Sequence, residues 1–381
     1  MINNFNIEIP KNIYFGVGVR QKLPEILNIY GKRVLFLTGA SWFPLSVWKK
    51  RFDRLLKNYS VCYHCCKGGE PTIDNINEII TMANNFRPDS IIGLGGGSVL
   101  DTAKAVSGLI FQEGKIEDYI EGVGTGKPVE NKIIPWIAMP TTSGSGAEVT
   151  KNSVIKIPSF HAKKSLRSPF LLAASVLVDP ELTLNLPKYL SGISGMDALV
   201  QLIESFVSKK CKPVPEALIK QAFPIMIKSL KMISKDLLDI KARCGAAYGS
   251  LISGLALANS GLGAVHGFAS GLGGLYDIPH GLICSVLINP VLEANANVIK
   301  KKIQVLLCDF PGIKNADPVD YLRNEIEKIL KYFDITPNLK SYCIKNDMAI
   351  KITQKSSGNS MSVNPRDLSI EEKEKIILSV I

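Results

Sequence analysis

Four side chains in the second half of the sequence could bind a metal ion or move protons. Asp197 and Gln201 are four residues apart, so on a helix they share one face, with Glu204 on the next turn. His266 and His280 each lie beside a glycine in an apolar stretch. Imidazole in such a setting is either a metal ligand or a hydrogen-bonded core residue. A buried polar pair that joins helices is the simpler interpretation of Asp197 and Gln201, so spacing alone leaves both open.

A glycine-rich turn in the first half could bind a phosphate. Residues 93–104 read GLGGGSVLDTAK and follow a buried apolar run, where a strand would give way to a helix. Glycines let backbone N–H groups approach a diphosphate closely, and a helix N-terminus adds unpaired donors. An ordinary glycine turn would look the same locally. The residues expected to hold the diphosphate of a dinucleotide are Gly95, Gly96, Gly97 and Ser98.

A second loop, PTTSGSGAEVT at 140–150, carries hydroxyls and glycines after another apolar run. Short hydroxyls suit the ribose and diphosphate oxygens of a dinucleotide. Both loops follow strands of a predicted parallel sheet, so they mark the crevice in which open α/β sheets bind ligands. We therefore predict that Thr141, Thr142 and Ser145 contact the cofactor. Asp101 is expected to border the same crevice.

The elements that would position these residues form two domains. Apolar runs alternate with helical patterns in the first half, an order typical of parallel βαβ units. The expected strands are 34–38, 59–64, 90–94 and 133–138, and the helices are 45–56 and 73–86. After about residue 186 the pattern is helical, with main segments at 192–207, 215–233, 241–262 and 282–307. We predict a Rossmann-like α/β domain at 1–185 and an all-helical domain at 186–381.

Composition limits the classes of protein. With 381 residues and 46% hydrophobic composition, the chain is long enough for two cores. Its formal net charge of +11 comes from dispersed basic residues without a long basic run, so no nucleic-acid partner is expected. The sequence has no apparent signal peptide, and no stretch reaches the roughly 18 uncharged apolar residues of a membrane helix. We expect a cytoplasmic protein with no membrane contact.

The eight cysteines are scattered and are expected to be reduced thiols. One cluster, Cys62, His64, Cys65 and Cys66, offers soft metal ligands. However, adjacent residues of an extended segment point to opposite sides, and no second pair of cysteines follows. We do not expect a metal there.

Taken together, the motifs resemble the iron-containing (group III) alcohol dehydrogenases. GGGSVLDTAK, PTTSGSGAEVT, GMDAL, the VHG and PHG histidines and the C-terminal NPRDL occur in that family's order and approximate spacing. The resemblance implies a dehydroquinate synthase-like fold with a dinucleotide-binding domain and a helical domain. It also implies a divalent metal, Fe²⁺ or Zn²⁺, at the family's aspartate and three histidine positions, here Asp197, Gln201, His266 and His280. Gln201 departs from that set, because a carboxamide oxygen is a poorer donor to these metals than imidazole.

The resemblance further implies an NAD(P)-dependent oxidoreductase that interconverts a small alcohol and its aldehyde or ketone. His266 and His280 would meet the substrate oxygen, and a homodimer is expected. NADP is favoured over NAD, because Gly39 and Ser41 stand where an acidic residue would hold the ribose and repel a 2′-phosphate. The changed ligand keeps two alternatives open. One is a metal-free reductase similar to maleylacetate reductases, in which a histidine donates the proton, and the other is a dinucleotide-binding protein without turnover.

Overall fold

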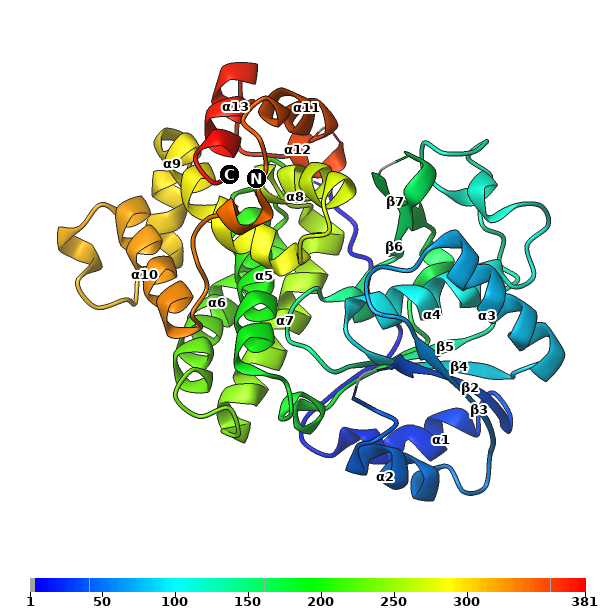
Figure 1. The fold of residues 1–381 in the computed structure, drawn as a ribbon. Coiled ribbons are helices and arrows are strands. Elements are labelled where there is room, and N and C mark those ends of the chain that lie inside the picture. Colours follow the sequence, from blue (N-terminus) through cyan, green and yellow to red (C-terminus); the bar gives the residue numbers. More distant parts are fainter. Residues whose placement is uncertain (1–3, 41, 161, 357) are drawn as a thin grey trace. The chain divides into compact units, whose positions relative to one another are not determined.

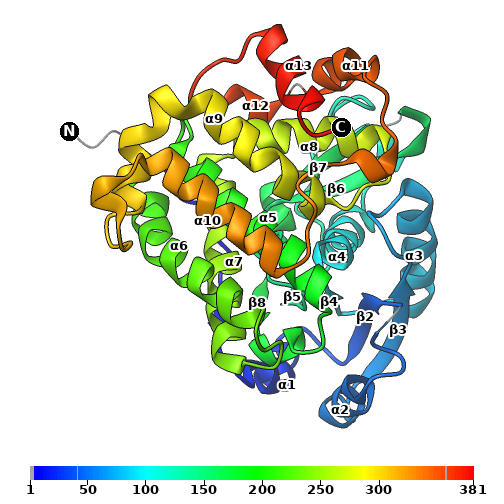
Figure 2. The same ribbon diagram turned by 60° about the vertical axis from the view of Figure 1, so that its left-hand side comes forward.

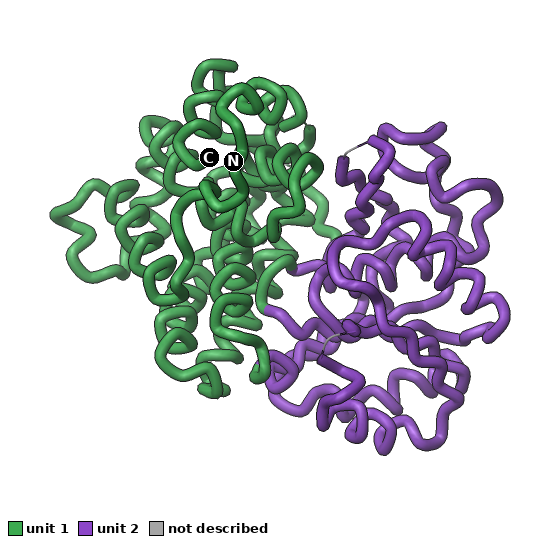
Figure 3. The backbone as a smooth tube through the Cα atoms, viewed as in Figure 1, with its two compact units in different colours: residues 1–8, 143–145, 184–381 green, residues 9–142, 146–183 purple. Residues whose placement is uncertain are grey.

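The computed structural model describes residues 4–40, 42–160, 162–356 and 358–381. The chain divides into two compact units, shown in Figure 3: an α/β unit of residues 9–142 and 146–183, and a helical unit of the remainder. The main division falls between Thr183 and Leu184, beside the expected one. Two short segments of the first half belong to the helical unit. Glu8 exchanges hydrogen bonds with the side chain of Asn259, and the Ser145 carbonyl accepts one from Gln201.

A six-stranded parallel sheet forms the centre of the α/β unit. Its spatial order is β1-β8-β5-β4-β2-β3. The strands are β1 (Ile13–Phe15), β2 (Arg33–Gly39), β3 (Ser60–Cys66), β4 (Ser90–Gly95), β5 (Trp136–Pro140) and β8 (Ser175–Val178). Every neighbouring pair is parallel. β4 therefore lies between β2 and β5, and its carboxyl end carries the glycine-rich turn.

Helices cover both faces of this sheet, as Figure 1 shows. On one face are α1 (Leu23–Leu27) and α2 (Val47–Leu55), and on the other are α3 (Ile73–Phe86) and α4 (Gly97–Leu109). A separate antiparallel hairpin of β6 (Asn152–Ile157) and β7 (Ala162–Arg167) was not expected from the sequence. Helices on both faces of a parallel sheet define a doubly wound α/β architecture.

The helical unit packs around α5. Its helices are α5 (Lys188–Val207), α6 (Pro213–Ile233), α7 (Ile240–Ser260), α8 (Ala264–Leu275), α9 (His280–Leu306), α10 (Pro318–Tyr332), α11 (Met348–Lys355), α12 (Asn359–Ser362) and α13 (Ile370–Leu378). Figure 2 shows α5 among α6, α7 and α9, and it is buried almost continuously from Ser191 onward. The predicted fold class, an α/β domain followed by an all-helical domain, is confirmed.

By length and composition alone, α5 and α9 are apolar enough to cross a membrane, and α7 with α8 would make a third span if that bent pair is counted. α5 contains Asp197 and Glu204, and α9 contains Glu293, so neither is an uncharged stretch of the kind sought in the sequence. Within the helical unit, 89% of the most apolar window of α5 and 61% of that of α9 are buried. Packing against neighbouring helices accounts for their apolar character.

Candidate functional site

Three helices of the helical unit bring four potential metal ligands together. Asp197 comes from α5, His266 from α8, and His280 and Cys284 from α9. One ligand atom from each lies within 4.8 Å of all the others. Within residues 4–40, 42–160, 162–356 and 358–381, this is the one group of three or more such residues whose ligand atoms meet so closely. Three of the four predicted metal-site residues are therefore neighbours, and a cysteine joins them.

Glu204 fixes the orientation of the His266 ring. The carboxylate accepts at 2.7 Å from Nδ1 of His266 and also at 2.7 Å from the backbone N–H of Val265, near the start of α8. With the proton of the neutral ring on Nδ1, the lone pair lies on Nε2. That Nε2 is 3.2 Å from Oδ1 of Asp197. Two acceptors at this distance repel each other unless a proton or a cation lies with them.

Gln201 lies beside the four potential ligands, but its amide oxygen accepts a hydrogen bond from another residue. Its Oε1 accepts from the Ser253 hydroxyl at 2.8 Å. Its Nε2 donates to Oδ1 of Asp197 at 3.2 Å and to the Ser145 carbonyl at 3.4 Å. These two acceptor oxygens identify which end of the Gln201 amide is the nitrogen. If the amide were flipped, its oxygen would face both the Asp197 carboxylate and the Ser145 carbonyl, and neither can donate a hydrogen bond. In this orientation Gln201 presents an N–H, not a lone pair, to Asp197.

The electrostatics of the cluster favour its charged forms. Burial lowers the pKa of both histidines, but other effects outweigh it. The charge of Cys284 and hydrogen bonds to Asp197, Cys284 and Glu204 raise the pKa of His266 well above 6.5, and the charges of Cys284 and Asp197 raise that of His280. Burial alone would raise the pKa of Asp197 and of Cys284, yet the nearby histidines lower both. The nearby histidines thus favour the anionic forms of two acidic groups in a buried place, which is the arrangement that attracts a cation.

The start of α9 requires glycine after His280. A Cβ on Gly281 would lie 2.2 Å from the carbonyl oxygen of Ile193 in α5. Only glycine permits this approach, which sets the His280 ring beside the α5 residues. The two rings also differ in exposure: the His266 side chain is 7% exposed and that of His280 is 38% exposed. Of the two predicted catalytic histidines, His280 is the more exposed.

The glycine-rich turn occupies the place expected for a phosphate site in the α/β unit. β4 ends at Gly95 and α4 begins at Gly97. A Cβ on Gly95 would lie 2.6 Å from Cβ of Val99, so the turn tolerates no side chain there. The first N–H groups of a helix have no intrahelical acceptors, and together with the helix dipole they suit an anion.

The other predicted cofactor residues divide into two groups. The N–H of Thr141 donates to the Gly95 carbonyl at 3.0 Å, and the Thr142 side chain borders Gly96, so both lie beside the turn. The Ser98 hydroxyl instead donates to the Gly69 carbonyl. Asp101 is buried and accepts from Nζ of Lys104 at 3.1 Å and from the N–H of Val154 at 3.0 Å. Its carboxylate ties α4 to β6.

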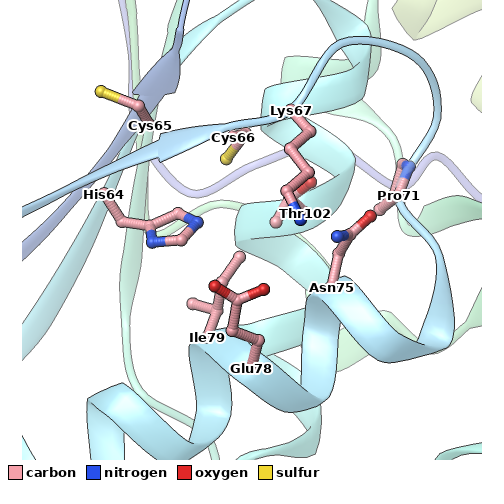
Figure 4. Close-up of a pocket in the computed structure, with 9 residues that line it drawn as sticks. All are labelled: His64, Cys65, Cys66, Lys67, Pro71, Asn75, Glu78, Ile79 and Thr102. Atoms are coloured by element: carbon pink, nitrogen blue, oxygen red, sulfur yellow. The ribbon is translucent and has the colours of Figure 1, made fainter.

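The carboxyl ends of β2 and β3 form the adjoining edge of the same sheet. Gly39 is the last residue of β2 and pairs in register with Cys66 of β3. The predicted cofactor residue Ser41 lies outside the described residues. Beyond Cys66, a pocket of about 100 Å³ is lined by His64, Cys65, Cys66, Lys67, Pro71, Asn75, Glu78, Ile79 and Thr102 (Figure 4). The figure shows the Cys65 sulfur on the opposite side of the strand from Cys66, as the extended backbone requires.

Sequence reasoning missed two side chains in these regions. Cys284 follows His280 by four residues, and this i, i+4 spacing on a helix was a signal that could have identified it. Ser143 was passed over within the hydroxyl-rich loop, although its hydroxyl is buried with no hydrogen-bond partner among the described residues. The loop pattern could not distinguish it from its neighbours.

Comparison with known proteins gives matches over nearly the whole chain. The family described as iron-containing alcohol dehydrogenase matches residues 10–180, and its C-terminal counterpart matches residues 192–381. Long-chain-alcohol dehydrogenase 1 of Geobacillus thermodenitrificans is 33% identical over 75% of this chain and 72% of that protein. NADPH-dependent butanol dehydrogenase of Clostridium saccharobutylicum is 28% identical over 97% and 96%. The solved sulfoacetaldehyde reductase of Bifidobacterium kashiwanohense, in complex with NAD+, has a TM-score of 0.90 at 24% identity over 99% of both chains.

Proposed function

The chain belongs to the iron-containing alcohol dehydrogenase family, and we propose that it is a metal-dependent enzyme that uses NADP to interconvert a small alcohol with its aldehyde or ketone. Family membership makes it an NAD(P)-dependent oxidoreductase of the alcohol dehydrogenase and aldehyde reductase class. The proposal adds the metal, the preference for NADP and the residues that act.

One observation carries the metal: Nε2 of His266 lies 3.2 Å from Oδ1 of Asp197 in a buried place. Nε2 of His280 lies 3.7 Å from the same oxygen. These donors fit a divalent cation, and Glu204 supplies the carboxylate behind a histidine that is common in metal sites. When bound, the cation would supply positive charge that polarises a substrate oxygen, and NADPH would supply the hydride. His280, the more exposed ring, would orient the substrate.

In the α/β unit, the N–H groups of the turn from Gly95 to Ser98 would bind the diphosphate. Thr141 and Thr142 would contact the ribose and the nicotinamide side. Ser145, which belongs to the helical unit, is also proposed as a cofactor contact. Asp101 is better explained as a support for α4, because its carboxylate already accepts from Lys104 and Val154. We assign the contact role to the backbone at the turn and not to that carboxylate.

The preference for NADP rests on the edge formed by β2 and β3. β2 ends at Gly39, which leaves no carboxylate to repel a 2′-phosphate. Lys67 follows Cys66, the register partner of Gly39, and lines the neighbouring pocket. A lysine ammonium at this edge would attract the 2′-phosphate that distinguishes NADP from NAD.

The metal-free alternative is favoured by the exposure of His280, whose side chain is 38% exposed. Without a metal, the charges of Cys284 and Asp197 raise the pKa of His280 despite burial. A protonated, partly exposed imidazole could donate the proton that follows hydride transfer to a carbonyl. The same ring would then stabilise the developing oxyanion.

Elemental analysis of the purified chain, followed by chelation and reloading with Fe²⁺ or Zn²⁺, tests the proposal. We expect about one metal per chain and NADPH consumption with short aldehydes that is lost and restored with the metal. Turnover that persists after complete removal of the metal would establish the metal-free alternative. Equal Michaelis constants for NADH and NADPH would contradict the cofactor preference.

A homodimer and a cytoplasmic location are further parts of the proposal that rest on the family resemblance and the sequence. The absence of a nucleic-acid partner rests on the dispersed basic residues. Size-exclusion chromatography with light scattering would give the oligomeric state directly.

A further inference from the structure

We infer that the fourth ligand of the metal site is the thiolate of Cys284, and that Gln201, which stands at the family's histidine position, does not bind the metal. This inference rests on the metal dependence proposed above. The resulting ligand set is Asp197, His266, His280 and Cys284, and it favours Zn²⁺ over Fe²⁺.

The geometry places Cys284 inside the group of donors. Its Sγ lies 3.7 Å from Nε2 of His266 and 3.6 Å from Nε2 of His280. These are the same two nitrogens that face Oδ1 of Asp197. The four atoms therefore surround one small volume, as the donors of a single ion must.

Gln201 is turned away from this role by its hydrogen bonds. Its oxygen accepts from Ser253 in α7, and its nitrogen donates to Asp197 and to the Ser145 carbonyl. To offer its oxygen to a metal, the amide would have to break all three bonds and leave buried polar groups unpaired. Its present orientation instead lets the N–H support the Asp197 carboxylate, as groups behind metal ligands commonly do.

Charge favours the same assignment. A thiolate adds a negative charge directly beside the cation, which a neutral amide does not, in a place where each of Asp197, His266 and Cys284 is less than 9% exposed. The Glu204 carboxylate accepts from His266 and so lies behind the ligands, not among them. A soft thiolate favours zinc, whereas the harder oxygen and nitrogen donors alone discriminate less.

The competing explanation is that Cys284 is a small core residue. It lies in the main apolar cluster of the helical unit, and buried cysteines are often inert. An inert thiol would remain protonated when a metal binds. A bound thiol would lose its proton and form a metal–sulfur bond.

Cobalt separates these possibilities, because thiolate bound to Co²⁺ gives a near-ultraviolet charge-transfer band that carboxylate, amide and imidazole do not. The metal-free protein is titrated with Co²⁺, and bound cobalt is measured by equilibrium dialysis. We expect one Co²⁺ per chain with the band in the wild type, in Gln201→Ala and in the control Cys308→Ser, which alters an exposed cysteine just beyond α9. In Cys284→Ser we expect no band and Zn²⁺ affinity lower by about 100-fold.

Two results on the wild type overturn the inference by themselves, so a misfolded variant cannot obscure them. One cobalt bound without the band overturns the role of Cys284 but leaves metal dependence intact. No cobalt bound at all overturns both this inference and the metal part of the proposed function. A band that persists in Cys284→Ser would assign the thiolate to another cysteine and overturn the inference, and loss of bound cobalt in Gln201→Ala would contradict the exclusion of Gln201 from the ligand set.

Discussion

At the scale of single residues, Glu204 shows how one carboxylate can orient a potential metal ligand without binding the metal itself. Its two oxygens accept from the backbone of Val265 and from Nδ1 of His266, so the start of α8 and the tautomer of the ring are set together. Asn364 adds a second acceptor for α8, at the N–H of Ala264. The His266 ring is therefore fixed in the orientation that a metal ligand needs before any ion arrives.

Glu204→Gln is expected to weaken metal binding by about 10- to 100-fold. The amide has one acceptor oxygen, which would stay with Val265, so its NH₂ would face Nδ1 and drive the ring proton to Nε2. Isothermal titration with Zn²⁺ measures the loss. Glu325→Gln is the matched control, because Glu325 is also a buried glutamate of the helical unit, paired with Lys231, and it lies outside the cluster. Equal affinity in the wild type and Glu204→Gln would show that the tautomer is set by other means.

The sequence indicated which residue types belong to the site but not how each side chain is oriented. Asp197, His266 and His280 were assigned from resemblance, and the structure brings them together. The direction of the Gln201 amide depends on Ser253, which is distant in sequence and comes near only when α5 and α7 pack. No local pattern carries such information. The i, i+4 spacing from His280 could have identified Cys284, but a buried cysteine in an apolar helix most often serves packing.

At the scale of elements, periodicity was most informative where a helix has one buried face. Residues 73–86 were predicted as a helix and form α3 with the same bounds. The strand at 133–138 begins later, as β5 at Trp136, and the β6–β7 hairpin was missed. The predicted helix at 282–307 begins two residues earlier, at His280. This shift matters, because it moves a predicted ligand from a loop onto the first turn of α9.

Gly281→Ala tests whether the approach of α9 to α5 holds the site together. The added methyl would meet the Ile193 carbonyl, so the start of α9 must move and carry His280 with it. We expect Zn²⁺ affinity to fall by at least about 10-fold while dinucleotide binding is retained. Gly68→Ala, where an added Cβ meets nothing within 4 Å, is the control for the same chemical change. Unaltered zinc affinity in Gly281→Ala would mean that the helix can shift without moving the ligand.

At the scale of the whole molecule, each candidate site is built largely within one unit. The metal ligands all belong to the helical unit, and the glycine-rich turn belongs to the α/β unit. The sequence pattern changes from alternating to helical at about residue 186, and the division between the units falls between Thr183 and Leu184. The sequence could not assign residues 143–145 to the helical unit, because their contacts there, such as the hydrogen bond from Gln201 to the Ser145 carbonyl, join residues distant in sequence.

Hydrogen exchange measured by mass spectrometry should therefore separate the two ligands. A ligand that binds only the folded state stabilises it by RT ln(1 + [L]/Kd), so Zn²⁺ at 100 times its Kd should slow global exchange of the helical unit by about 100-fold. We expect this protection in α5, α8 and α9, whereas NADPH should protect residues 93–104 most strongly. Asp197→Asn should abolish the zinc effect and keep that of NADPH. Zinc protection centred on β3 and α3 instead would place the metal at the His64 and Cys66 pocket and contradict the assignment to the helical unit.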